Sequence, residues 1–341
     1  MHADDSALPR LPTRDAAGHK GTFGRVAVVG GCAAHPRMIG GPALAAIAAL
    51  RAGAGLVRLV MPEPVLTAGL TVAPSATGAA IGVGEDDQIE PHEAARALDE
   101  ALEGCDCLAI GPGLGSGGAG ARAICLRAVM QQERPAVVDA DALNNLAATP
   151  GLRHDFRAAA VLTPHPGEFE RLSTSLGLGL GTGAATDEAA RPAACAALAQ
   201  TLGCVVVLKG APTVVSDGHR TWINVGDGAR NPTLATAGTG DVLTGLIAAL
   251  IAHAGARGSR GEDLRALAAA ALRARGMGHH APADAAHRAD QGLSLYDCAR
   301  LGVRAHAIAG LAWSRASGAS GGMLALDLAA HIPAAVESLR R

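Results

Sequence analysis

Aromatic residues are nearly absent from this sequence of 341 residues, of which Phe, Tyr and Trp together make up 2%. Hydrophobic residues nevertheless account for 49% of the chain, so the core has to be built from Ala, Val, Leu and Ile. The 45 glycines and the many alanines favour closely packed elements and glycine-rich loops. The length suffices for one large domain or two small ones with a buried core.

Several other features are missing. The seven cysteines contain no Cys-x-x-Cys spacing, so neither a zinc site nor a disulfide framework is indicated. A net charge of −2 gives no reason to expect nucleic acid or an anionic membrane surface as a partner. Residues 1–14 lack the apolar core of a signal peptide. The apolar run 243–252 has about half of the ~20 residues that cross a membrane. We therefore expect a soluble, cytoplasmic protein.

Short apolar runs that alternate with helical patterns predict a mostly parallel sheet. Strands are expected at residues 25–30, 56–61, 107–110, 136–138, 158–162 and 204–208, and helices at 43–52, 92–102, 187–202, 242–252, 297–313 and 326–339. Asp217-Gly218 lies between residues 213–216 and 219–224, which predicts an antiparallel hairpin. Residues 1–20 are expected to be a loose leader, and 254–291, with three histidines at 279, 280 and 287, a surface insertion.

The segment 231–245 has the pattern of an anion-binding site. Gly238, Thr239 and Gly240 precede a helical run, where the first backbone N–H groups have no intrahelical partner and the dipole favours negative charge. Asp241 has two interpretations. It caps the helix, which its spacing alone favours, or it is a base that faces a hydroxyl group while the glycines hold a phosphoryl group.

Further polar residues follow other predicted strands. Asp139 and Asp141 come after 136–138, and the carboxyl ends of parallel strands are where ligands bind in open α/β sheets, although Asp141 is equally suited to cap a helix. His165 is held between two prolines and is a candidate ligand, with Glu168 in the first turn of the next helix. Lys209 is a loop lysine or a phosphate contact.

The sequence contains one weak nucleotide-binding pattern and lacks another. Residues 113–118 match Gly-x-Gly-x-x-Gly after a strand, but the expected acidic residue ~20 positions later is not cleanly placed, so a glycine-rich turn is an equal interpretation. A Walker motif is absent, which excludes a P-loop protein.

Taken in order, the motifs resemble one family. They are Ala-Leu-Arg-Ala-Gly-Ala-Gly-Leu-Val (49–57), Gly-Pro-Gly-Leu-Gly (111–115), Val-Asp-Ala-Asp-Ala-Leu-Asn (138–144), Thr-Pro-His-Pro-Gly-Glu-Phe (163–169), Lys-Gly-Ala-x-Thr (209–213) and Asn-Pro-x-x-Ala-Thr-Ala-Gly-Thr-Gly-Asp-Val-Leu-Thr-Gly (231–245). This set, with the ending at 324–333, is similar to the ADP/ATP-dependent NAD(P)H-hydrate dehydratases over about residues 20–335.

The resemblance implies a ribokinase-like α/β fold, a three-layer sandwich whose mostly parallel central sheet has flanking helices and an antiparallel hairpin. It also implies a repair reaction, in which the S-form of hydrated NADH or NADPH is phosphorylated on its hydroxyl by ADP or ATP and phosphate is then eliminated. Mg²⁺ would bridge the nucleotide phosphates. A homotetramer is implied as well, and an epimerase partner, often fused upstream in the family, is expected to be a separate chain.

The resemblance also assigns site residues. Asp241 would be the general base, and the N–H groups of Gly238 to Gly240 would stabilise the transferring phosphoryl group. The nucleotide would contact Lys209, Gly210, Ala211, Pro212, Thr213 and Gly240, and the hydrated cofactor would contact Pro42, Gly115, His165 and Asp241. No protein metal ligand is assigned.

Two positions depart from the family pattern. Arg230 stands where the family usually has Gly, and Pro42 where it has Ala. Two alternatives remain open: a small-molecule hydroxyl kinase of the same fold, which would accumulate a phosphorylated product, and a nucleotide-binding regulator without turnover, against which the intact Asp241 and its glycines argue.

Overall fold

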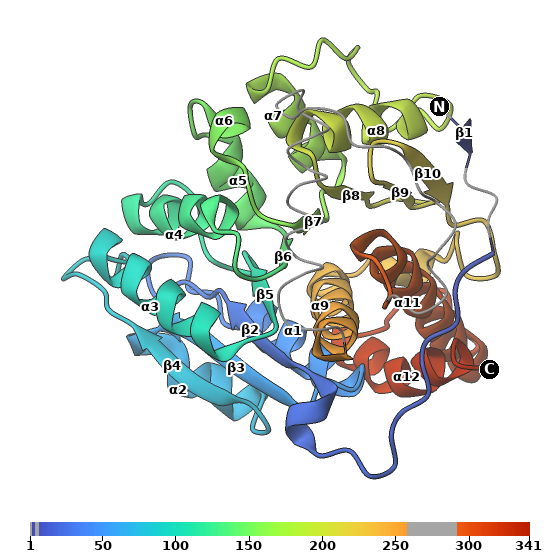
Figure 1. Ribbon diagram of the computed structural model, residues 1–341, viewed down its shortest axis with the longest axis horizontal. Coiled ribbons are helices and arrows are strands. Elements are labelled where there is room, and N and C mark those ends of the chain that lie inside the picture. The colour runs from blue at the N-terminus through green and yellow to red at the C-terminus, as the bar shows by residue number, and fades with distance from the viewer. Residues whose placement is uncertain (1, 4–6, 258–291) are drawn as a thin grey trace.

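A ten-stranded sheet runs through the centre of the computed structural model, which describes residues 2–3, 7–257 and 292–341 (Figure 1). The strand order is β1-β10-β9-β8-β7-β6-β5-β2-β3-β4. The strands are β1 (His2–Ala3), β2 (Arg25–Val29), β3 (Leu56–Pro62), β4 (Thr77–Ile81), β5 (Cys107–Ile110), β6 (Ala136–Val138), β7 (Ala160–Leu162), β8 (Val205–Leu208), β9 (Val214–Ser216) and β10 (Arg220–Ile223).

Only β9 runs antiparallel to its neighbours, pairing Val215 with Val207 of β8 and with Trp222 of β10. The adjacent strands β8, β7, β6, β5, β2, β3 and β4 are all parallel to one another. The expected mostly parallel sheet with one antiparallel hairpin is therefore confirmed. Parallel strands place their carboxyl ends at one edge of the sheet, and this edge gathers the polar residues considered below.

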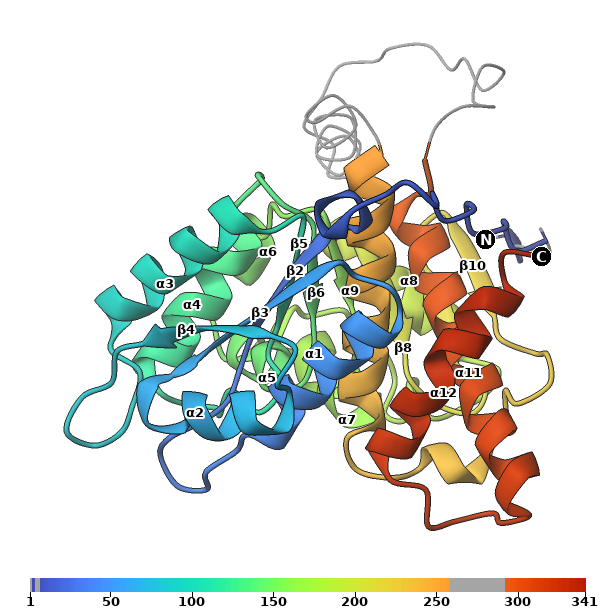
Figure 2. The same ribbon diagram turned by 90° about the horizontal axis from the view of Figure 1, so that it is seen from below.

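Helices cover both faces of the sheet, so the expected three-layer arrangement is confirmed (Figures 1 and 2). One layer holds α1 (Gly40–Arg51), α2 (Glu63–Val72), α9 (Thr239–Arg257), α11 (Leu295–Ser317) and α12 (Ala325–Ser338). The other holds α3 (Pro91–Gly104), α4 (Ala119–Met130), α5 (Asp141–Ala147), α6 (Leu152–Asp155), α7 (Pro166–Ser175) and α8 (Arg191–Leu202). Short 3₁₀ helices are η1 (Lys20–Phe23) and η2 (Pro232–Leu234).

The central strands contribute alternate residues to the two layers. In β2, Val26 and Val28 pack in the core under α1 and α9, whereas Ala27 and Val29 pack in the core under α3 and α4. This alternation explains why the strands read as continuous apolar runs, because both faces are buried.

Small residues let the helices approach closely. A Cβ atom on Gly245 of α9 would lie 1.9 Å from the carbonyl oxygen of Ala45 in α1, so the two backbones touch where only glycine fits. This contact fixes the N-terminal half of α9 against α1. Among the described residues, none of the helices is long and apolar enough to cross a bilayer.

Some elements differ from the expectations. Residues 62–104, which gave no clear pattern beyond one helix, also contain α2 and β4. The helix expected from residue 187 begins at Arg191, because Pro192 is favoured in a first turn and residues 187–190 form a turn before it. The helices expected around residues 242–252 and 297–313 are present but longer, and the one expected at 326–339 is present one residue earlier, as α12.

Part of the N-terminal segment packs on the domain. Leu11 is buried, and its N–H donates to the carbonyl oxygen of Leu339 over 2.8 Å. The division into a leader (1–20) and one domain (21–341) with an insertion at 254–291 stays a prediction. Residues 258–291, including the three clustered histidines, lie outside the described residues.

Candidate active site

The N-terminus of α9 is formed by a tight turn that needs glycine. Gly238 has φ +87°, and a Cβ atom there would lie 2.7 Å from Leu44 Cδ1 and 2.9 Å from Ala325 Cβ. The hydroxyl of Thr239 donates to the carbonyl oxygens of Leu234 and Thr236, both over 2.8 Å. The first N–H groups of α9 are therefore held in place by the segment that precedes them.

Three charged side chains meet beside this helix end. Lys209, which follows β8, places Nζ 2.8 Å from Oδ1 of Asp139, which follows β6, and 3.7 Å from Oε2 of Glu168 in α7. Both carboxylates are almost fully buried, with 1% and 5% of the side chain exposed. A buried carboxylate needs such a partner to remain charged.

Asp139 also links this cluster to α9, because its Oδ2 accepts a hydrogen bond of 2.7 Å from Thr244 Oγ1. A Cβ atom on Gly240 would lie 3.5 Å from Lys209 Nζ, so the lysine ammonium faces the glycine turn. The ends of β6 and β8 and the start of α9 thus form one site, as expected where parallel strands end.

Asp241 stands in the first turn of α9 with a strongly perturbed pKa. Burial raises the pKa of this carboxyl, the negative charge of Asp139 raises it further, Lys209 opposes them, and the result is about 7. A carboxyl group with a pKa near neutrality is suited to act as a general base, because it holds and releases a proton at working pH. It can therefore do more than cap the helix.

The pKa values of two neighbouring charged groups, Lys209 and Glu168, are also shifted. Burial alone would lower the pKa of Lys209, but Asp139 and Glu168 outweigh it and the pKa is raised, so the lysine remains a cation. Burial raises the pKa of Glu168 despite the nearby lysine. An anion entering the site would meet one firmly held cation and the N–H groups of a helix N-terminus.

His165 caps α7 in this structure. Its Nδ1 accepts from the N–H groups of Gly167 (3.0 Å) and Glu168 (3.4 Å), and the carboxylate of Glu168 accepts the N–H of His165 over 2.8 Å. Burial and the charge of Lys209 lower the pKa of His165. The imidazole is half exposed, with 51% of its side chain accessible, so it can still be reached by a ligand.

Gly115 is hydrogen-bonded to the start of α5. Its N–H donates to Asp141 Oδ2 over 2.9 Å, and its carbonyl oxygen accepts from Asn145 Nδ2 over 2.8 Å. Asp141 also acts electrostatically on Asp241, which it helps to keep protonated. Pro42 is buried in the first turn of α1 beside Gly30 and Gly113. Asp141 thus anchors the 111–115 loop to the start of α5.

The loop after β8 is shaped by Arg191 of α8. Its Nη2 donates to the carbonyl oxygens of Leu208, Lys209 and Pro212 over 3.0 to 3.2 Å, and its Nη1 donates to Ala185 over 2.7 Å. The Ala211–Pro212 peptide bond is cis, and Thr213 Oγ1 donates to Gly210 over 2.9 Å. Five of the six residues predicted to bind a nucleotide, 209–213, therefore form one loop held by a buried guanidinium, and the sixth, Gly240, lies in the first turn of α9.

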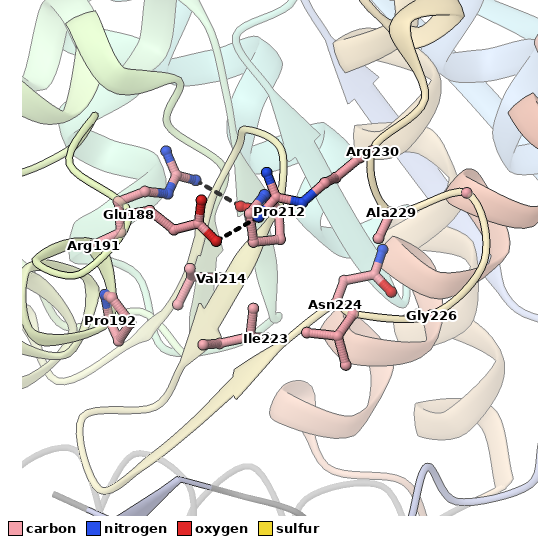
Figure 3. A pocket seen from close by; sticks show the side chains of 12 residues that line it. Glu188, Arg191, Pro192, Pro212, Val214, Ile223, Asn224, Gly226, Ala229 and Arg230 are labelled. Carbon is pink, nitrogen blue, oxygen red and sulfur yellow. Dashed lines mark hydrogen bonds and ion pairs between the residues drawn. The ribbon is translucent and has the colours of Figure 1, made fainter.

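A cavity of about 430 Å³ opens next to this loop (Figure 3). Its lining comes from the start of α8, from Pro212 and Val214, and from the segment 223–230. Arg230 crosses its rim, forming an ion pair with Glu188 and donating to the carbonyl oxygen of Ala211 over 3.3 Å. The departure at position 230 thus adds a contact between two sides of the cavity.

The described residues contain no group of three or more His, Cys, Asp or Glu side chains placed to hold a metal ion. Two of the carboxylates beside the glycine turn, Asp139 and Glu168, are already paired with Lys209. A divalent cation here would depend on oxygen ligands from a bound phosphate and water, which is the usual way Mg²⁺ is held.

Some residues of the site were not singled out from the sequence. Thr244 and His306 lie in expected helices whose apolar pattern indicates only burial, and Arg191 lies inside the helix expected over 187–202. Glu168 carries a signal, since it stands three residues after His165, the spacing of a capping box. Long-range hydrogen bonds such as that of Thr244 to Asp139 leave no trace in local sequence.

The fold and the site define the class of protein as a three-layer α/β protein with a ribokinase-like fold. A ribokinase-like superfamily protein from Enterococcus faecalis superposes with a TM-score of 0.67 at 21% identity, covering 97% of this chain and 93% of the other. An ADP/ATP-dependent NAD(P)H-hydrate dehydratase from Bacillus subtilis, co-crystallised with ATP and Mg²⁺, superposes with a TM-score of 0.65 at 25% identity, covering 97% and 95% of the two chains.

The chain belongs to the NAD(P)H-hydrate dehydratase family, whose model matches residues 26–334. It is 38% identical over 250 residues to an ADP-dependent (S)-NAD(P)H-hydrate dehydratase of Xanthomonas campestris, covering 73% of this chain and 79% of the relative. It is 42% identical over 250 residues to a bifunctional NAD(P)H-hydrate repair enzyme of Moorella thermoacetica, covering 71% of this chain but 43% of that longer protein. The family resemblance read from the motifs is thus confirmed.

Proposed function

We propose that this chain is a nucleotide-dependent dehydratase that returns the S-form of hydrated NADH or NADPH to NAD(P)H. ADP or ATP gives its terminal phosphoryl group to the hydroxyl of the hydrate, which leaves AMP or ADP. The resulting phosphate ester then loses inorganic phosphate from one ring carbon and a proton from the next, and the ring double bond reforms. Phosphorylation is needed because hydroxide is a poor leaving group.

Asp241 accepts the hydroxyl proton as the oxygen attacks phosphorus. Its perturbed pKa of about 7 supports this role, and it is the observation that carries the proposal. The N–H groups of Gly238 to Gly240, directed out of the N-terminus of α9, stabilise the charge on the transferring phosphoryl group. Lys209 adds a positive charge beside Gly240.

The nucleotide occupies the loop from Lys209 to Thr213 and the cavity lined by Pro212. The cavity supports this placement because Pro212 of the 209–213 loop is part of its lining, and Lys209 of the same loop faces the glycine turn of α9. The hydrated nicotinamide ring lies on the other side of Asp241, toward Gly115, His165 and Pro42. Mg²⁺ would supply positive charge that offsets the charge of the nucleotide phosphates.

The remaining expectations from the resemblance are part of the proposal. The enzyme acts in the cytoplasm as a homotetramer. Light scattering of the purified protein measures the tetramer directly, and a mass near that of one 33.9 kDa chain would contradict it.

The activity is tested by following absorbance at 340 nm with purified protein, Mg²⁺ and chemically prepared hydrated NADH, in the presence of ADP, ATP or neither. We expect recovery of NADH absorbance that requires a nucleotide, and the faster nucleotide names the donor. Asp241→Ala is expected to abolish it. A matched control is Asp99→Ala, which removes an exposed carboxylate of α3 that is paired with Arg127 of α4.

The outcomes separate the alternatives. Absence of recovery with either nucleotide would overturn the dehydratase. Transfer of phosphate to another small-molecule hydroxyl, with accumulation of the phosphorylated product, would instead support a kinase of the same fold.

A further inference from the structure

His306 lies in the middle of α11, where its imidazole reaches the start of α9. Its Nε2 is 2.9 Å from the carbonyl oxygen of Thr239, the first residue of α9. A carbonyl oxygen only accepts hydrogen bonds, so Nε2 carries the proton and donates it. The imidazole therefore contacts the backbone of the turn that carries Gly238 and Gly240.

This hydrogen bond is additional to the one that the helix supplies. In an α-helix the carbonyl of Thr239 is paired with the N–H four residues later, that of Leu243. A carbonyl oxygen has two lone pairs and accepts a second donor. The carbonyl of Thr239 therefore has a hydrogen-bond partner without His306. The hydrogen bond from the imidazole is an additional influence on this peptide group.

The peptide group that His306 contacts also carries the N–H of Gly240. A trans peptide is planar, with its C=O and N–H pointing in opposite directions. A donor on the carbonyl of Thr239 fixes the plane of this peptide and polarises it, so its N–H becomes a stronger and better directed donor. That N–H points out of the N-terminus of α9, and a Cβ atom on the same residue would lie 3.5 Å from Lys209 Nζ.

Two contacts hold the same peptide from different sides. The Thr239 hydroxyl is tied to Leu234 and Thr236 on the N-terminal side, and the imidazole is tied to the carbonyl from α11. The pKa of His306 is lowered to about 4, chiefly by burial, with Lys209 acting in the same direction. The imidazole is therefore neutral at working pH and contributes a directed donor without a second positive charge.

We propose that His306 is a positioning residue. Through the hydrogen bond from its Nε2 to the carbonyl oxygen of Thr239, it aligns and polarises the Gly240 N–H that faces the transferring phosphoryl group. The inference rests on the proposed function, since it assigns Gly240 a phosphoryl group to bind. It predicts that the donor, and not merely the volume of the side chain, matters for turnover.

The test compares His306→Gln with His306→Met in the full chain. The two replacements are unbranched and of similar size, but only the Gln amide can donate to Thr239. Loss of a direct oxyanion donor lowers kcat about 10²- to 10³-fold, so for a residue that acts through another we expect His306→Met to lose roughly tenfold or more in kcat. KM for the nucleotide should change less than about threefold, and His306→Gln should recover most of kcat.

A matched control is His331→Met. This imidazole also lies 2.9 Å from a helix carbonyl, that of Asp327, but in α12. It should leave kcat unchanged. Equal kcat for wild type and a folded His306→Met variant, or equal losses for Met and Gln, would overturn the proposal.

A second readout does not depend on activity. In ¹⁵N-glycine-labelled protein the Gly240 resonance, assigned by its loss in Gly240→Ala, should move upfield in His306→Met and stay near its wild-type position in His306→Gln. An unmoved Gly240 signal in His306→Met would overturn the positioning role even if the wild-type protein were active. If the wild type shows no nucleotide-dependent NADH recovery while the signal moves as expected, the proposed function fails and the polarised N–H stands.

Discussion

Replacing Asp241 by Asn should make the protein more stable while it destroys catalysis. The carboxyl is partly buried among Asp139, Asp141 and Glu168, with Lys209 opposing them, and its pKa is raised from 3.8 to about 7. The folded protein therefore holds a proton on Asp241 at pH values where the unfolded chain has lost it. Because the folded state binds more protons between about pH 4 and 7, wild-type stability decreases as the pH rises through this range.

The size of the effect follows from the shift. One pKa unit corresponds to about 1.36 kcal/mol, so a shift of about three units gives roughly 4 kcal/mol at most at pH 8. Asn loses the favourable interaction of a carboxylate with the helix N-terminus, about 0.3–1 kcal/mol, and salt screens the neighbouring charges further. We expect a net gain of about 1–2 kcal/mol for Asp241→Asn at pH 8.

Thermal unfolding at pH 5 and pH 8 measures this prediction. An unfolding entropy of about 2.1 cal/mol/K per residue over 341 residues converts 1 kcal/mol into roughly 1.4 °C, so Tm should rise by about 1.5–3 °C at pH 8 and by clearly less at pH 5. Asp327→Asn, at the start of α12, serves as the control and should show no such pH-dependent gain. A Tm below that of wild type at pH 8, or a gain that does not shrink toward pH 5, would refute the reasoning.

Three further predictions concern the same site. For the pH profile, kcat/KM of the wild-type enzyme should rise up to about tenfold per unit below pH 7 and level off above it, since Asp241 accepts a proton only when ionised; a flat profile from pH 5.5 to 8 would contradict this. Arg191→Lys removes the hydrogen bonds of the guanidinium to the carbonyl oxygens of Leu208, Lys209 and Pro212. If the less ordered loop costs roughly 1–1.5 kcal/mol of binding free energy, the apparent KM for the nucleotide should rise about tenfold. An unchanged KM would show that the loop does not need the guanidinium. Gly238→Ala forces a Cβ atom against Leu44 and Ala325 at φ +87°, and should cost more than about 1 kcal/mol in denaturant unfolding together with most activity; wild-type stability would count against the tight turn.

Local sequence patterns were sufficient for the elements that carry the site. The runs before Asp139 and Lys209 are short, apolar and followed by polar residues, so both strand ends and the hairpin at Asp217-Gly218 could be placed. The turn before α9 could be placed because glycines followed by an apolar run have few other interpretations. Between residues 62 and 104, by contrast, β4 has only one buried residue, Ile81, and so gives no clear strand pattern.

The charge balance of the site could not be predicted from local sequence. Whether Asp241 is a cap or a base depends on its burial and on Asp139, 102 positions earlier in the chain (241 − 139). Likewise His165 was considered as a ligand because prolines flank it, and the structure adds that its imidazole caps α7. Arg191 and His306 act on backbone carbonyls, and such contacts have no residue-type signature on the side that accepts them.

The most direct test of the central claim is the balance of phosphorus during NADH recovery. With hydrated NADH, Mg²⁺ and a limiting amount of the preferred nucleotide, ³¹P NMR and absorbance at 340 nm should show equal amounts of nucleotide consumed, phosphate released and NADH formed, with no lasting phosphate ester. NADH formed without nucleotide consumption, or a phosphorylated product that accumulates while NADH does not appear, would contradict phosphorylation followed by elimination at Asp241.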